Sequence, residues 1–282
     1  MNATDEAGGI KRQSQRMVLT LIAGAAAAAT LFPIIWMLLI SLKTQREALA
    51  FPPVFVFEPI FDAYRAVWAR NGFAPALLNS LIVSTLTLAV CLAVGLLAGY
   101  ALSRFRFRGA DSILFAALAT RIFPPVALVI PYYLNMQWLG LQDSISALVM
   151  AYVAMNTPLA IWMLKGYFDA IPPDLENCAM VDGANRWQVA TRITLPLIAP
   201  GIAATSVFVF VGAWNEFLFA ITLTSKSART LPTVIAEFIG DTGIEWPQIM
   251  AASTIALAPV LIATFALQRH IAKGMTAGAM KG

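Results

Sequence analysis

The side chains that most often perform chemistry in proteins are scarce in this sequence. His270 is the only histidine, so no triad, dyad or metal cluster that depends on histidine can form within the chain. The two cysteines, Cys91 and Cys178, are not spaced as zinc ligands, and no GxxxxGKS or GxxxxGKT phosphate-binding loop is present. We therefore expect no catalytic residue, no metal site and no cofactor site in this chain.

Four residues with polar or aromatic side chains interrupt stretches that are otherwise apolar: Arg121, Trp214, Asn215 and Glu216. A charge at the centre of a membrane-spanning helix costs roughly 2.5–3.5 kcal/mol, so it must face a polar cavity, a partner or a helix end. These residues either line a path for a solute or hold the protein together. For Arg121 we favour a structural ion pair, with Glu216 as the candidate partner.

The stretch PPDLENCAMVDGANRWQVATRITLP, residues 172–196, is the longest polar interruption in the second half of the chain. Its two leading prolines favour a first helical turn, and acidic residues follow at the positive end of that helix. Gly183 predicts the end of the first helix, Asn185 caps a second one, and Pro196 should break the second. One face of the first helix is small and apolar, formed by Leu175, Cys178 and Ala179, with Asp182 next at the same three-to-four-residue spacing.

The elements that position these residues are membrane helices. Of the 282 residues, 59% are hydrophobic and 12% are charged, a balance outside that of soluble proteins. Apolar runs near the ~20 residues needed to cross a bilayer cover 17–40, 76–101, 112–134, 144–164, 198–221 and 248–268. We predict an all-α membrane protein with six transmembrane helices, the third kinked by its prolines. The first run is too long for a signal-peptide core, so we expect a retained span.

Lysine and arginine are distributed unequally between the two sets of loops. The tails 1–16 and 269–282, loop 102–111 and loop 165–197 together hold twelve, against six in the opposite loops. The side with more positive charge is expected to be the cytoplasm, which places both termini and the 172–196 segment there. Arg104, Arg106 and Arg108 alternate with aromatic residues, and we interpret them as anchors at the membrane surface rather than as a nucleic-acid site.

The run IPPDLENCAMVDGANRWQVATRITLPLIAPG resembles the cytoplasmic loop signature of permease subunits in binding-protein-dependent ABC importers. That signature reads EAA, three residues, G, nine residues, I, one residue, LP, and Gly183, Ile193, Leu195 and Pro196 fall on its spacing. Residues 118–134, 212–239 and 250–282 also look like the carbohydrate branch, in particular the six-helix permease of maltose transporters.

The resemblance implies a type I importer fold in a bacterial inner membrane, with residues 17–268 as the transmembrane domain and 172–196 as its coupling loop. It implies a second permease subunit, two copies of a cytoplasmic ATPase that bind ATP and Mg²⁺, and an external sugar-binding protein. The helix 174–183 would then couple ATP-driven closure of the ATPase pair to alternating access. The residues implied in coupling are Glu176, Asn177, Cys178, Ala179, Asp182, Gly183 and Ala184.

The sequence departs from the signature at its first two positions. Counting back six residues from Gly183, the usual Glu is Asn177 and the first Ala is Cys178, while Glu176 lies one position early. A step of one residue turns a side chain by about 100° around a helix, so Glu176 cannot simply replace the missing acid. We expect Asn177 to make a neutral hydrogen bond to the same partner.

The same resemblance gives the intramembrane residues a possible substrate. Asn215 would hydrogen-bond sugar hydroxyls and Trp214 would stack on a ring face, although in the maltose family the partner permease can hold most of the sugar. The alternative class is an ion-coupled secondary carrier, and a membrane enzyme is a third possibility that lacks a cluster of catalytic side chains. The sequence does not reveal which sugar, polyol or derivative would be carried.

Overall fold

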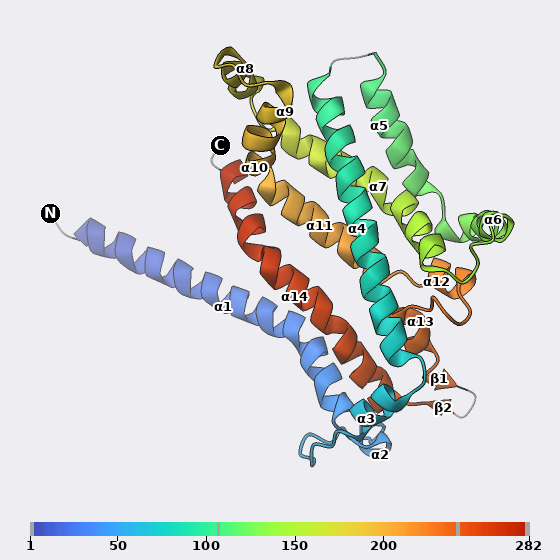
Figure 1. The fold of residues 1–282 in the computed structure, drawn as a ribbon. Coiled ribbons are helices and arrows are strands. Elements are labelled where there is room, and N and C mark those ends of the chain that lie inside the picture. The colour runs from blue at the N-terminus through green and yellow to red at the C-terminus, as the bar shows by residue number, and fades with distance from the viewer. Residues whose placement is uncertain (1–2, 106–107, 241–242, 280–282) are drawn as a thin grey trace. The chain divides into compact units, whose positions relative to one another are not determined.

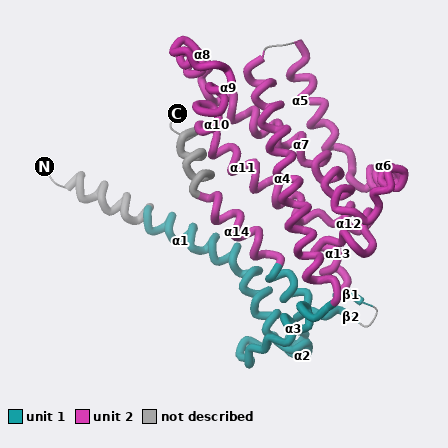
Figure 2. The backbone as a smooth tube through the Cα atoms, viewed as in Figure 1, with its two compact units in different colours: residues 1–70, 238–255 teal, residues 71–237, 256–282 magenta. Residues whose placement is uncertain are grey.

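The computed structural model describes the backbone of residues 3–105, 108–240 and 243–279, and the side chains of 16–105, 108–240 and 243–268. Nearly every described element is a helix. The chain forms two compact units, residues 1–70 with 238–255, and residues 71–237 with 256–282 (Figure 2). Arg106 of the predicted arginine anchor lies outside the described residues, whereas Arg108 is described and exposed.

The first unit joins one long helix to a set of short elements. They are α1 (Ala3–Ser41), α2 (Gln45–Ala48), α3 (Asp62–Ala69), β1 (Ile239–Gly240), β2 (Gly243–Ile244) and the start of α14 (Trp246–Ala279). The two strands pair antiparallel, with Ile239 opposite Ile244. Thr44 and Glu47 form a capping box that starts α2. The stretch 51–68 contains no helix long enough to cross a membrane.

The second unit contains the remaining helices (Figure 1). They are α4 (Phe73–Arg104), α5 (Ala110–Ala119), η1 (Thr120–Ile122), α6 (Pro125–Trp138), α7 (Ile145–Asp169), α8 (Pro173–Val181), α9 (Arg186–Val189), the π-helical η2 (Ala190–Thr194), α10 (Leu195–Leu197), α11 (Ala199–Trp214), α12 (Leu218–Leu223), α13 (Leu231–Ala236) and the later part of α14. An apolar core of this unit lies between α4, α6, α7, α11 and α12.

Helices α4 and α7 lie side by side because small residues recur along one face of α4 (Figure 1). Cys91, Gly95 and Gly99 follow one another at intervals of four and are buried. A Cβ atom added at Gly99 would lie 3.1 Å from the backbone nitrogen of Lys165, and one at Gly95 would lie 3.0 Å from Leu164. Small residues at this spacing allow close backbone approach between membrane helices.

Four helices are long and apolar enough to cross a membrane, and six spans result if each of two bent pairs counts as one. The four spans formed by single helices are 16–41, 73–104, 145–169 and 246–268, near the predicted first, second, fourth and sixth runs. The third run is broken as predicted: α5 with η1 meets α6 at an angle of 95°. Pro124, which cannot donate a backbone hydrogen bond, lies at that break.

One expectation about a helix end is wrong. The fifth run does not continue to residue 221, because α11 ends at Trp214 and α12 begins afresh at Leu218. At the C-terminal side, α14 continues through a glycine- and alanine-rich stretch as far as Ala279.

Candidate functional site

Helix α8 is a short, well-delimited helix in the polar segment 172–196. Pro172 precedes it with φ −58°, and Asp174 lies in its first turn, where an acid interacts favourably with the helix dipole. At the other end Gly183 adopts φ +92°, a left-handed conformation that glycine tolerates best. The Gly183 and Ala184 amides donate to the carbonyls of Met180 and Ala179, which is the Schellman pattern. The predicted stop at Gly183 is thus confirmed.

The exposed face of α8 carries apolar side chains. Val181 is 87% exposed and Leu175 is 50% exposed, on a helix that the charge pattern placed outside the bilayer. We call this the α8 surface, made of Leu175, Asn177, Cys178, Met180 and Val181, all exposed. Exposed apolar groups on a polar segment indicate a surface that a partner covers.

The structure separates the residues predicted to couple to a partner. Asn177, Cys178, Asp182 and Gly183 are exposed, whereas Ala179 and Ala184 are half-buried. Glu176 differs from all of them because it is buried against its own chain. Asn177 therefore points outwards at the position where the family signature has Glu, while the acid one residue earlier points inwards.

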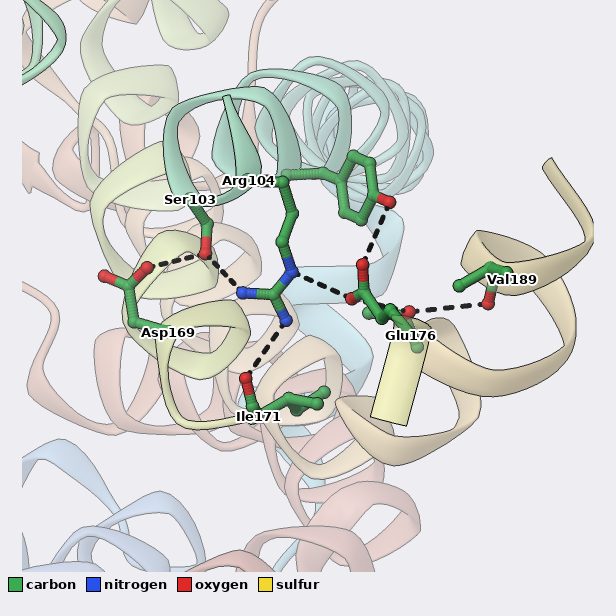
Figure 3. A network of polar contacts seen from close by, with 8 residues as sticks. Ser103, Arg104, Asp169, Ile171, Glu176 and Val189 are labelled. Atoms are coloured by element: carbon green, nitrogen blue, oxygen red, sulfur yellow. Dashed lines mark hydrogen bonds and ion pairs between the residues drawn. The ribbon is translucent and has the colours of Figure 1, made fainter. Parts of the chain in front are cut away.

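Glu176 makes a buried ion pair with the last residue of α4. The Nε atom of Arg104 donates to Glu176 Oε1 at 2.8 Å, and both side chains are more than nine-tenths buried (Figure 3). Thr194 Oγ1 donates to the same carboxylate oxygen at 3.0 Å, and Tyr100 Oη donates to the other at 3.3 Å. Both oxygens of Glu176 are thus occupied by partners within the chain.

The remaining donors of Arg104 connect this pair to the end of α7. Its guanidinium group donates to the Ile171 carbonyl at 3.2 Å and to Ser103 Oγ at 3.0 Å. Ser103 in turn donates to Asp169 at 2.6 Å, and Asp169 also pairs with Lys165 at 2.7 Å (Figure 3). The network therefore joins α4, α7, α8 and η2, and every charged group in it has a partner of opposite sign.

The second helix of the polar segment begins as predicted but ends differently. Asn185 caps α9, with Gln188 completing a capping box. The chain then passes through η2 and continues through Pro196 to Leu197, so the predicted break at Pro196 is wrong. The bend of 71° lies between Leu197 and Ala199. A π-helical turn, which ends with the Leu195 amide donating to the Ala190 carbonyl, precedes Pro196.

Two of the four intramembrane candidates have structural contacts. Trp214 is 3% exposed, stacks on Phe210 and donates from Nε1 to the Ala256 carbonyl at 3.1 Å, so its ring is not free to stack on a sugar. Glu216 accepts the amides of Phe219 and Ala220 at 2.9 and 3.1 Å and thereby caps α12. A carboxylate at this place satisfies amides that would otherwise be unpaired.

The other two candidates are exposed at helix breaks. Asn215 follows the last residue of α11, and Arg121 lies in η1 at the bend of the third span. The favoured structural pairing of Arg121 is wrong, because no acidic side chain in the described part of the chain lies within ion-pair distance of it. Arg121 and Asn215 thus remain open to solute or to a partner.

A hollow in the first unit was not anticipated from the sequence. It has a volume of about 840 Å³ and opens between the start of α3 and the start of α14. Its polar lining includes Lys43, Gln45, Asp62, Glu245 and Gln248, with Trp246 beside them. The ammonium group of Lys43 donates to the Val54 carbonyl at 2.5 Å and lies over two aromatic rings. The amide, carboxylate and indole groups of this lining are suited to hydrogen bonds with a polar partner.

Residues 91–277 match the family described as the binding-protein-dependent transport system inner membrane component. The match covers more than half of the chain, so the protein belongs to this family: it is a multi-pass membrane component of a binding-protein-dependent transport system. The matched range includes α8, η2 and both bent spans.

Individual relatives extend the similarity to nearly the whole chain. The probable ABC transporter permease protein y4oR of Sinorhizobium fredii is 35% identical over 96% of this chain and 97% of its own. The trehalose/maltose transport system permease protein MalG of Thermococcus litoralis is 38% identical over 95% of this chain and 98% of its own. A chain of a bacterial ABC transporter that imports alginate has the same fold, with a TM-score of 0.70, 24% identity and coverage of 95% and 98%.

Proposed function

We propose that this chain is the permease subunit of an ATP-driven importer that carries a sugar or sugar derivative across a bacterial inner membrane. Family membership supports a transport role, and the trehalose/maltose relative supports a carbohydrate substrate. The chain supplies half of the translocation path and one coupling helix. Transport proceeds by alternating access, with both termini and α8 on the cytoplasmic side.

The observation that carries the proposal is the α8 surface. It presents apolar side chains on a helix fixed at both ends by a proline start and a Schellman stop. A rigid helix with an exposed apolar face fits a groove on another protein. In this proposal the groove belongs to a cytoplasmic ATPase, of which two copies bind below two permeases. ATP and Mg²⁺ are bound by those ATPases.

An external sugar-binding protein delivers the substrate in this proposal. The hollow beside Trp246 supports this assignment, because its amides and carboxylates suit a polar protein surface. Within the membrane, Arg121 and Asn215 are the candidate path residues, since Arg121 is exposed at the break of the third span and Asn215 is exposed where α11 ends. Trp214 and Glu216 stabilise the helices around that path.

Cross-linking tests the docking of α8. Native Cys178 is exposed on α8, whereas Cys91 is buried, so a thiol-reactive linker should join Cys178 to cysteines placed in the cleft of the ATPase. A control with Cys178→Ser and Trp138→Cys carries an exposed cysteine at the end of α6 and should form no such product. Absence of the Cys178 product in the assembled complex would contradict docking through α8.

Reconstitution tests the transport mechanism. Vesicles that contain both permeases, the ATPase and the sugar-binding protein should accumulate sugar only with ATP, and vanadate should stop uptake. An ion-coupled carrier would instead respond to collapse of the proton or sodium gradient and ignore vanadate. Uptake that persists without nucleotide would therefore refute the proposal.

A further inference from the structure

Helix α8 is held to the rest of its unit by more than chain connectivity. The Arg104–Glu176 pair connects it to the end of α4, and the Thr194 hydroxyl connects it to η2. The donors of Arg104 that do not contact Glu176 reach Ser103 and the Ile171 carbonyl. Figure 3 shows the guanidinium group of Arg104 between these acceptors.

A buried ion pair of this kind resists being opened. Removing one partner leaves the other charge in a site without water, which is far more costly than losing a surface pair. The acceptors of Glu176 are already used within the chain, so an outside cation would have to displace Arg104. The pair is therefore suited to holding two elements together rather than to binding a partner.

We propose that Arg104 and Glu176 form a latch that makes α8 and the adjoining ends of α4 and α7 one rigid body. This inference rests on the proposed function: movement imposed on α8 by an ATPase passes through the latch into α4. The close contact of Gly99 with Lys165 then carries the same movement to α7. Both latch residues are positioning residues, and neither contacts the solute in this proposal.

A distance measurement tests the rigid body without relying on transport. In the assembled complex with Cys91→Ala and Cys178→Ser, spin labels are attached at Asp174→Cys on α8, outside the α8 surface, and at Leu97→Cys on α4, both exposed in the chain. With the latch intact, the distance distribution should have one narrow peak. Glu176→Gln, which keeps the side-chain shape and removes the charge, should broaden it. An equally narrow peak in Glu176→Gln would overturn the latch.

The transport-to-ATP ratio tests the role of the latch in coupling. Glu176→Gln should lower sugar moved per ATP hydrolysed by about tenfold, within the usual range of coupling free energies. Asp174→Asn, an exposed acid on the same helix, is the matched control and should leave the ratio unchanged. If transport and hydrolysis instead fall together, in proportion to assembled complex, the pair is only structural and the proposal is overturned.

Two further variants keep the test decisive if Glu176→Gln assembles poorly. Tyr100→Phe removes only the 3.3 Å hydrogen bond to Glu176 and should give an intermediate ratio. The exchange Arg104→Glu with Glu176→Arg should recover part of the lost ratio, and no recovery in an assembled complex would count against the latch. Failure of the latch and failure of the proposed function give different results. If the proposed function is wrong, wild-type uptake needs no nucleotide, whereas Glu176→Gln still broadens the distance distribution.

Discussion

The carboxylate of Asp143 accepts the backbone amide of Ser227 at 2.8 Å, and it also accepts the amides of the three neighbouring residues Ser225, Lys226 and Ala228. Asp143 holds a left-handed conformation, with φ +49°, to reach them. One side chain therefore fixes the loop that follows α12, and α7 begins two residues beyond it.

We expect Asp143→Asn to lower the free energy of unfolding at pH 7 by roughly 2 kcal/mol, the size of hydrogen bonds to a charged group. Thermal unfolding in detergent measures this. Asp62→Asn is the control, because the ion pair of Asp62 with Arg65 is exposed at both ends and should contribute little. An equal loss in both variants would show that the loop contacts of Asp143 are not the cause.

The contacts of the Asp143 carboxylate also predict that the free energy of unfolding depends on pH. Burial raises the pKa of Asp143, but the four amides lower it more, so the pKa lies well below the ordinary value of 3.8. A depressed pKa gives stability that is present above 3.8 and is lost as the pH falls through the folded-state value. The difference between wild type and Asp143→Asn should stay constant from pH 7 to about 5 and narrow only in stronger acid.

Gly183→Val should damage coupling more than folding. A side chain with φ near +92° costs about 1–2 kcal/mol, which should disturb the end of α8. Gly140→Val is a matched control, since Gly140 also ends a helix at positive φ but follows α6. Both should lose similar thermal stability, whereas only Gly183→Val should reduce sugar moved per ATP. If Gly183→Val and Gly140→Val moved equal amounts of sugar per ATP, the end of α8 would have no special role in coupling.

Gly201→Ala should destabilise the contact between α11 and α7. A Cβ atom at Gly201 would lie 2.2 Å from Tyr167 Cγ, so the ring must move, at a cost of roughly 1–3 kcal/mol. Gly166→Ala, where nothing lies within 4 Å, should be neutral or stabilising by about 0.5–1 kcal/mol. Melting temperatures of the two variants provide the comparison. A stable Gly201→Ala protein would mean that the two helices are less closely packed than described.

Glu216→Ala should reduce stability by about 1 kcal/mol, the usual cost of a lost helix cap, without changing the KM for sugar. Asn215→Ala should raise the KM for sugar without changing stability, because the Asn215 side chain is exposed after α11 and makes no capping contact. Thermal unfolding and uptake kinetics of the same preparations separate the effects. A raised KM in Glu216→Ala at unchanged stability would return Glu216 to the translocation path.

Much of the fold could be predicted because its signals are local. Run length gave the four spans formed by single helices, Pro124 marked the broken third span, and Gly183 and Asn185 marked the ends of the loop helices. The end of α11 was missed although Asn215 and Glu216 interrupt the apolar run there, because apolar residues resume at once in α12, which also has buried residues. Run length cannot reveal a bend when both sides of it face a core.

The predicted site was incomplete for a different reason. Arg104 and Glu176 are 72 positions apart, and a single sequence does not show which distant charges meet. Glu176 was therefore grouped with its exposed neighbours, although a helix turns adjacent side chains to different faces. One visible signal was overlooked: small residues at intervals of four from Cys91 to Gly99 indicate a helix that closely approaches another.

That close approach restricts which parts of the protein can move. A methyl group at Gly95 or Gly99 would lie 3.0 or 3.1 Å from the nearest atom of α7, closer than ordinary van der Waals contact, so α4 and α7 are closely packed along this face. We therefore expect α4 and α7 to move together as one rigid body. If the chain works by alternating access as proposed, we expect the route through the bilayer to open and close at the 95° and 71° bends, where the spans are already interrupted.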